Sequence, residues 1–309
     1  MKMNKLNMDM FISNYMNFVN NISNKFNYDN NIKHLLYIII PACIIKYGII
    51  NERKILSIFE NIEIIIANKQ NDNYIASFNR TIIKTGNKYK IDKKVFLNKY
   101  KKISLVSLLD SLIHEFNHAI NSINNELKEE NETIYLRGGL SYTKYSANDL
   151  KENTPDSNLI ILEETLNTIQ TEEIIKIILS FKNYRIDDDE VNNLVYSLNN
   201  ELDSKFMSEA YFLQTFVIRE LAKNITFIST LQKMRFSGYE FNIEEWFDEI
   251  TGVKGSLQEL CNNLQKIEYL EKKLVTNKFL KSWTKKKIII IFKKVQEIAN
   301  LFSSNCIYK

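Results

Sequence analysis

The chain has 309 residues, of which 45% are hydrophobic and 25% are charged, the proportions of a folded globular protein and not of a disordered one. Its 41 basic and 37 acidic side chains leave a net charge of +4, which is too balanced to predict nucleic-acid binding. With only 7 Gly and 2 Pro, the chain has few turn-forming residues, which excludes an all-β architecture of many strands and favours long helices.

The three cysteines, Cys43, Cys261 and Cys306, are far apart and include no C-x-x-C pair, which predicts a reducing compartment and no disulfide scaffold. The first residues lack the apolar core and the cleavage site of a signal peptide. The longest apolar run, residues 35–45, contains Pro41 and is shorter than the roughly 20 residues that span a bilayer. We therefore expect a soluble, cytoplasmic protein with no membrane span.

Helices are expected over most of residues 9–60, where apolar side chains recur at helical spacing. The next segment is rich in β-branched residues and contains a Gly86-Asn87 turn, which predicts a small sheet with a hairpin. Its strands are expected at 62–67, 74–78, 81–83 and 88–92. A long helix is expected at residues 104–123. These elements make up a predicted first domain at residues 1–125.

Residues 126–158 are polar and charged and contain Gly138-Gly139, which predicts an irregular excursion with a short hairpin at 140–145. Helical periodicity resumes at Leu159 and continues nearly to the end of the chain. Breaks between helices are expected near Arg185, Lys205, Gly238 and residues 252–255. A second domain is therefore expected at residues 126–309, and the chain is predicted to be an α+β protein that is mostly helical.

One motif on the predicted central helix indicates a metal site. It is His114-Glu115-Phe116-Asn117-His118. Two histidines four positions apart on a helix bind one Zn²⁺ through their ring nitrogens, and the glutamate after the first is placed to take a proton from metal-bound water. Because the chain has only 3 His, random placement gives such a match on the order of a few times in a thousand. The motif therefore predicts a zinc site.

The periodicity of this helix agrees with that prediction. At 100° per residue, its apolar residues fall on one side and its polar residues on the other, with His114 and His118 near the centre of the polar arc. An ordinary amphipathic surface helix with solvated histidines has the same pattern, so periodicity alone does not separate the two interpretations. The low chance frequency of the motif favours the metal site.

A catalytic zinc site needs a third protein ligand and an open position for water. Because His34 lies far upstream and no cysteine is near, a carboxylate is expected. On the next predicted helix, residues 159–179, Glu164 shares a polar arc with Asn167 and is the preferred ligand, whereas Glu163 on the flank is the second choice. Other acidic candidates lie in loop-like sequence: Glu129, Glu130, Glu132 and Glu152. Without a metal, acidic residues at a helix start are explained by the helix dipole.

With Glu164 on a separate helix after the motif, the chain resembles the gluzincin metallopeptidases, the thermolysin-like superfamily. Residues 162–168, Leu-Glu-Glu-Thr-Leu-Asn-Thr, are similar to the segment around the third ligand in that family, and the resemblance covers residues 62–179. It implies a motif helix under a small twisted sheet whose edge strand lines the cleft. The resemblance also implies a role for each residue that matches the family's motifs, with His114, His118 and Glu164 as zinc ligands and Glu115 as general base.

Gluzincins often use a histidine or a tyrosine to stabilise the tetrahedral intermediate. Because this chain has no spare histidine, a tyrosine is expected in that role, with Arg137 as an alternative. The tyrosine candidates lie in the excursion and on a later helix, and are Tyr142, Tyr145 and Tyr211.

The resemblance thus implies a zinc-dependent metallopeptidase that hydrolyses peptides or proteins with a zinc-bound water activated by Glu115. An edge strand near residues 81–91 would bind the substrate backbone by strand addition. Two alternatives remain open. One is a regulatory or binding protein that keeps the zinc site but has little turnover, and the other is a toxin-type protease that acts on a specific protein. No nucleic-acid partner is expected.

Overall fold

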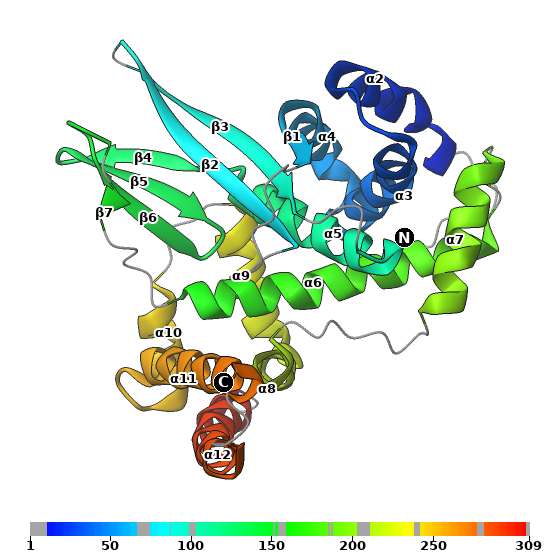
Figure 1. Ribbon diagram of the computed structural model, residues 1–309. Coiled ribbons are helices and arrows are strands. Elements are labelled where there is room, and N and C mark those ends of the chain that lie inside the picture. Colours follow the sequence, from blue (N-terminus) through cyan, green and yellow to red (C-terminus); the bar gives the residue numbers. More distant parts are fainter. Residues whose placement is uncertain are drawn as a thin grey trace. The chain divides into compact units, whose positions relative to one another are not determined.

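The computed structural model (Figure 1) describes residues 11–66, 75–86, 88–98, 103–150, 152–153, 159–184, 186, 188–202, 211–237, 242–276 and 281–306. The chain divides into two compact units, of which unit 1 comprises residues 1–120 and 170–208, and unit 2 comprises residues 121–169 and 209–309. The helices α5 (Leu105–Ser122) and α6 (Ile160–Ser180) each continue across this division. Each unit is therefore built from two separate stretches of the chain, whereas the sequence-based domains 1–125 and 126–309 are continuous.

The helical part of unit 1 is built around α3 (Asn30–Tyr47). This helix begins after Asp29, whose side chain accepts a hydrogen bond of 3.0 Å from the backbone N–H of Ile32. Residues 35–44, Pro41 included, are all buried, so the longest apolar run of the sequence is a core helix. The other helical elements are α2 (Met16–Phe26), η1 (Ile49–Asn51), α4 (Glu52–Asn61), most of α5, the second half of α6, η3 (Phe181–Asn183) and α7 (Asp189–Glu201).

The sheet of unit 1 has the strands β1 (Glu63–Ile66), β2 (Ala76–Thr85) and β3 (Lys88–Leu97) in the order β1-β3-β2. β1 runs parallel to β3, and β2 is antiparallel to it, so β2 and β3 form the predicted hairpin. The hairpin is longer than predicted, because Asn79 and Arg80 pair with Lys94 and Lys93 in one continuous ladder. Ladder hydrogen bonds come from backbone groups, so two polar residues do not interrupt them.

The predicted amphipathic helix is α5, and its apolar side is buried in unit 1. Leu109, Leu112 and Ile113 are fully buried, and the ring centroid of Phe116 lies 4.3 Å from that of Phe59 on α4. Asn117, on the polar side, is fully buried as well. The polar side of α5 is therefore not the solvated face of an ordinary surface helix.

Unit 2 contains a second sheet where the sequence predicts an irregular excursion. Its strands β4 (Leu127–Glu130), β5 (Thr133–Gly138), β6 (Ser141–Ser146) and β7 (Glu152–Asn153) are antiparallel and lie in this order (Figure 1). The prediction of irregular structure was wrong at these strands. The hairpin predicted at 140–145 was also wrong in its bounds, because residues 141–146 form the single strand β6, which pairs with β5 across the turn at Gly139 and Leu140. Buried Ile134, Leu136 and Gly138 alternate with half-buried residues along β5. The neighbouring charged residues obscure this two-residue period in the sequence.

The helical part of unit 2 consists of the first half of α6, α8 (Phe212–Ala222), α9 (Ile225–Ser237), α10 (Ile243–Thr251), α11 (Ser256–Thr276) and α12 (Lys281–Cys306). These helices share one core, in which the ring centroid of Phe302 lies 5.3 Å from that of Phe227 and 4.5 Å from that of Phe247. The break predicted at 252–255 lies between α10 and α11, and the three other predicted breaks fall outside the described residues. The predicted class, α+β with mostly helices, is confirmed.

Two of the three cysteines, Cys43 and Cys261, carry free and buried thiols, and the side chain of Cys306 lies outside the described residues. Burial raises the pKa of both described thiols, and with Glu244 nearby it raises the pKa of Cys261 to about 12. Both thiols are therefore protonated at neutral pH.

Within the part of the chain that the structure describes, no single helix combines the length and the apolar composition that a membrane span requires. Residues 30–47 and 49–61 meet these criteria only as a pair, and the two segments are bent by 113° at the break between them.

Candidate metal centre

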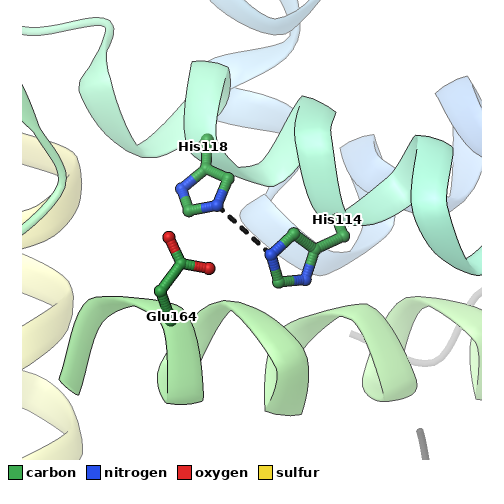
Figure 2. Close-up of side chains that lie close together, drawn as sticks. All are labelled: His114, His118 and Glu164. Carbon is green, nitrogen blue, oxygen red and sulfur yellow. Dashed lines mark hydrogen bonds between the residues drawn. The ribbon is translucent and has the colours of Figure 1, made fainter. Parts of the chain in front are cut away.

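The two motif histidines direct their rings toward each other from successive turns of α5. The Nε2 atoms of His114 and His118 lie 3.2 Å apart (Figure 2). Two nitrogen ligands that each lie about 2.0–2.1 Å from a tetrahedral zinc ion are about 3.3 Å apart. The spacing of the histidine nitrogens therefore fits a shared metal ion.

Glu164 on α6 completes a group of three side chains. One ring nitrogen of each histidine and one carboxylate oxygen of Glu164 lie within 4.8 Å of one another, and all three residues are half-buried. Among the described residues, this is the one group of three or more His, Cys, Asp or Glu side chains with such spacing. The structure thus brings together the three residues that the sequence predicts as zinc ligands.

Hydrogen bonds within unit 1 join the motif to the second half of α6. The Asn117 amide donates to Oγ1 of Thr171 at 3.1 Å. The single O–H of Tyr47 can donate to either of two acceptors, Oδ1 of Asn117 at 2.8 Å or Oε1 of Gln170 at 3.1 Å. Sequence analysis missed these positioning residues. The one available signal was the position of Asn117 inside the motif on the same helical arc as the histidines.

Glu163, the second choice for the third ligand, forms an ion pair with Arg235. Its side chain is 2% exposed, and its Oε2 atom accepts hydrogen bonds from Nε of Arg235 at 2.9 Å and from the backbone N–H of Leu140 at 2.8 Å. Glu163 is absent from the group of three described above, and Glu164 occupies the third place. The alternative assignment to Glu163 is therefore not supported by this geometry.

The acidic candidates in the second sheet also lie apart from this group. Glu129 and Glu130 are exposed on β4, Glu132 is exposed in the β4–β5 turn, and the side chain of Glu152 lies outside the described residues. Within the described part of the chain, none of these residues joins the histidines in the group of three.

Arg137, the alternative stabiliser of the tetrahedral intermediate, is engaged by backbone carbonyl groups. Its Nη1 atom donates to the carbonyl oxygens of Gly139 at 2.8 Å and of Met234 at 3.0 Å, and its Nη2 atom donates to that of Asn121 at 3.3 Å. These contacts give Arg137 a structural role in unit 2, because its charge is directed at the main chain.

The tyrosine candidates all belong to unit 2. Tyr142 on β6 is 37% exposed and makes an edge-to-face contact with Tyr135, with ring centroids 5.8 Å apart. Tyr145 lies half-buried on the same strand, and Tyr211 precedes α8 with a φ of +53° and contacts the helical core. Their predicted role in stabilising the tetrahedral intermediate stays a prediction.

Comparisons of this chain with protein-family models, with curated protein sequences and with solved structures find no match. The resemblance to the gluzincins therefore rests on the motif of α5 and on the segment around Glu164.

Proposed function

We propose that this protein is a zinc-dependent metallopeptidase of the gluzincin type. The observation that carries the proposal is the group of His114, His118 and Glu164, in a chain whose first motif histidine is followed directly by Glu115. A pair of histidines at helical spacing is weak support for a catalytic zinc site when no third ligand is near. A single acidic group is weak support for such a site when no histidine pair is near. Their combination is the ligand set of catalytic zinc sites that hold two His and one Glu.

The donor atoms favour zinc over other divalent ions. Two imidazole nitrogens and one carboxylate oxygen suit zinc, whereas Mg²⁺ and Ca²⁺ prefer sites made of oxygen ligands. We propose that α5 supplies both nitrogen ligands and that α6 supplies the oxygen ligand. When bound, zinc would act as a Lewis acid that lowers the pKa of a coordinated water and polarises the substrate carbonyl group.

Glu115 would move the protons of the reaction. Its ionised carboxylate would accept a proton from the attacking water as the new C–O bond forms, and would then donate this proton to the leaving amine as the C–N bond breaks. The side chain of Glu115 is half-buried on α5. A half-buried carboxylate is held by its neighbours and still meets solvent, as a group that exchanges protons with water must.

The sheet of unit 1 offers an edge to an extended substrate. In the described strand order β1-β3-β2, β2 lies at one edge, and Ile83 on this strand is exposed. Edge strands have backbone groups that can pair with an added strand. We therefore propose that β2, in the first half of the region predicted from sequence, binds the substrate backbone.

The proposal includes a reducing, cytoplasmic environment. It is supported by the free, buried thiols of Cys43 and Cys261 and by the absence of a C-x-x-C pair from the sequence.

The test combines metal analysis with a cleavage assay. We expect purified protein to hold about one zinc ion per chain and to cleave members of a peptide library, with activity lost on chelation. Glu115→Gln should keep its zinc and lower turnover by roughly 100- to 10,000-fold. A Glu115→Gln variant with full turnover contradicts the assigned base. Zinc binding without cleavage supports the regulatory alternative, and cleavage confined to one intact protein supports the toxin-type alternative.

A further inference from the structure

Unit 2 contains a buried ion pair between Glu163 on α6 and Arg235 on α9. The two side chains are 2% and 1% exposed. Arg235 donates from Nε to Oε2 of Glu163 at 2.9 Å and from Nη2 to Oε1 at 2.5 Å, so the contact is bidentate. Burying two charges is costly unless each is paired, so a buried ion pair is weak evidence for stability, and in some proteins such a pair fixes one arrangement of the chain instead.

The same arginine holds α6 at a second point. Its Nη2 atom donates to Oδ1 of Asn167 at 3.3 Å, and Asn167 lies four positions after Glu163, on the same face of the helix. A third donor to Glu163 is the backbone N–H of Leu140, at 2.8 Å. The first half of α6 is thus held through one of its faces by α9 and by the turn between β5 and β6.

That turn fits closely against the Glu163 carboxylate. Gly139 has a φ of +64°, and a Cβ atom at this position would overlap all three atoms of the carboxylate group. Arg137 donates to the carbonyl oxygens of Gly139 and of Arg235, so it joins the turn to the end of α9. The two groups that bind the Glu163 carboxylate, the turn at Gly139 and the end of α9, are therefore held together by Arg137.

Two adjacent glutamates on a helix point in directions about 100° apart. Glu164 belongs to the group with His114 and His118 (Figure 2), whereas Glu163 binds Arg235. A rotation of α6 by one residue would exchange these two chemically identical side chains. Because Arg235 binds Glu163, it favours the rotation of α6 in which Glu164 faces the histidines.

We propose that the Glu163–Arg235 pair is a positioning device that sets the rotation of α6, so that Glu164 serves as the third zinc ligand. The inference rests on the proposed function, since it takes Glu164 to be a ligand. Its physical basis is that a ligand must be held within a fraction of an ångström of its productive position, which a helix held on one face provides.

The test measures zinc affinity in folded variants. Replacing only one partner leaves a buried unpaired charge, which can prevent folding. The main variant is therefore the double substitution Glu163→Gln/Arg235→Met. It removes both charges and keeps an acceptor for the backbone N–H of Leu140. Glu163→Asp is the second variant, because it keeps the ion pair and shortens the side chain by one methylene group. Zinc dissociation constants are measured by chelator competition at a temperature at which circular dichroism shows each protein to be folded.

We expect zinc binding about 10- to 100-fold weaker in the double variant and about 10-fold weaker in Glu163→Asp. The visible absorption of the Co²⁺-substituted protein should change in both, because loss of the carboxylate ligand alters the coordination. Asp248→Asn is the matched control: it replaces one of the two carboxylate oxygens that accept hydrogen bonds from the backbone N–H groups of Gly255 and Ser256 in the same unit, and it leaves the contacts of α6 intact. It should lower stability and leave zinc affinity unchanged.

Folded variants with wild-type zinc affinity and an unchanged Co²⁺ spectrum overturn the inference. If Glu164→Gln loses zinc in the same assay, the proposed metal site stands and only the positioning role fails. Wild-type protein that binds no zinc overturns both.

Discussion

The side-chain amide of Asn117 on α5 donates a hydrogen bond of 3.1 Å to the hydroxyl of Thr171 on α6, and both side chains are buried. Asn117 lies inside the motif, one position before His118. Thr171 lies about two turns after Glu164 on a continuous helix. A single buried contact thus joins the turn of α5 that carries the histidines to the helix that carries the third candidate ligand.

Asn117→Ala should destabilise the protein by about 1–3 kcal/mol, because it removes buried hydrogen bonds to Thr171 and Tyr47. Thr171→Val should cost less, and the two substitutions together should cost less than the sum of their separate effects, with a coupling free energy of about 0.5–3 kcal/mol. Urea unfolding of the four proteins measures this cycle. Asn61→Ala is the control, since the Asn61 amide bonds a carbonyl group on the exposed side of α4 and its loss should stay within about 0.5 kcal/mol. Additive effects would contradict the proposed link between the helices.

Zinc should stabilise the folded protein. At a free zinc concentration of 100 times the dissociation constant, the gain in free energy of unfolding should be about 2.7 kcal/mol, and chelation should reverse it. Thermal unfolding with and without zinc measures the effect. His118→Ala and Glu164→Gln should abolish most of the gain. His34→Ala should retain it, because His34 lies outside the group of three and its Nε2 atom lies 3.1 Å from Oε2 of Glu190. A gain that persists in His118→Ala and Glu164→Gln would indicate that zinc binds elsewhere.

Gly139→Ala should destabilise the protein more than Gly86→Ala. Both glycines have positive φ, +64° and +60°, so both substitutions carry the cost of a left-handed conformation, about 1–2 kcal/mol. A Cβ at Gly139 meets the Glu163 carboxylate, while a Cβ at Gly86 has no neighbour within 4 Å among the described residues. The steric overlap should add about 1–3 kcal/mol at Gly139 alone. Denaturant unfolding of both variants tests this difference. Equal losses in the free energy of unfolding would show that the turn at Gly139 moves away from Glu163 at no cost.

Asp248→Asn should reveal a pH-dependent part of the stability of unit 2. Burial opposes ionisation of this carboxyl group, but hydrogen bonds from Gly255, Ser256 and Leu257 outweigh it and lower the pKa of Asp248. A carboxyl group with a lowered pKa in the folded state stabilises the protein above its unfolded pKa of about 3.9, and the contribution disappears as pH falls through the folded value.

Because solvent screens this carboxylate, the Asp248→Asn variant should be less stable than the wild type at pH 7 by about 0.5–1 kcal/mol. The difference should shrink as the pH falls below about 4. Glu297→Gln, on an exposed position of α12, should show no comparable loss. A difference that persists unchanged to low pH would attribute the effect to packing and not to charge.

Local patterns of sequence were enough to predict the helix of the motif and the orientation of its histidines. A four-residue spacing on a helix places two side chains on one face whatever the rest of the chain does, because the helical repeat is a backbone property. The same reasoning placed the hairpin at Gly86 and the helix that carries Glu164. It failed at the strands β4 to β7, where charged residues next to β5 in the sequence obscured the two-residue alternation along that strand.

The choice between Glu163 and Glu164 shows where such reasoning stops. Both are glutamates at the start of one helix, and their periodicity gave only a preference. The residue that distinguishes them, Arg235, lies 72 positions later in the chain and becomes their neighbour only when α9 folds against α6. Contacts of this kind depend on burial and on which elements meet in space, and neither property can be read from residues that are adjacent in the sequence.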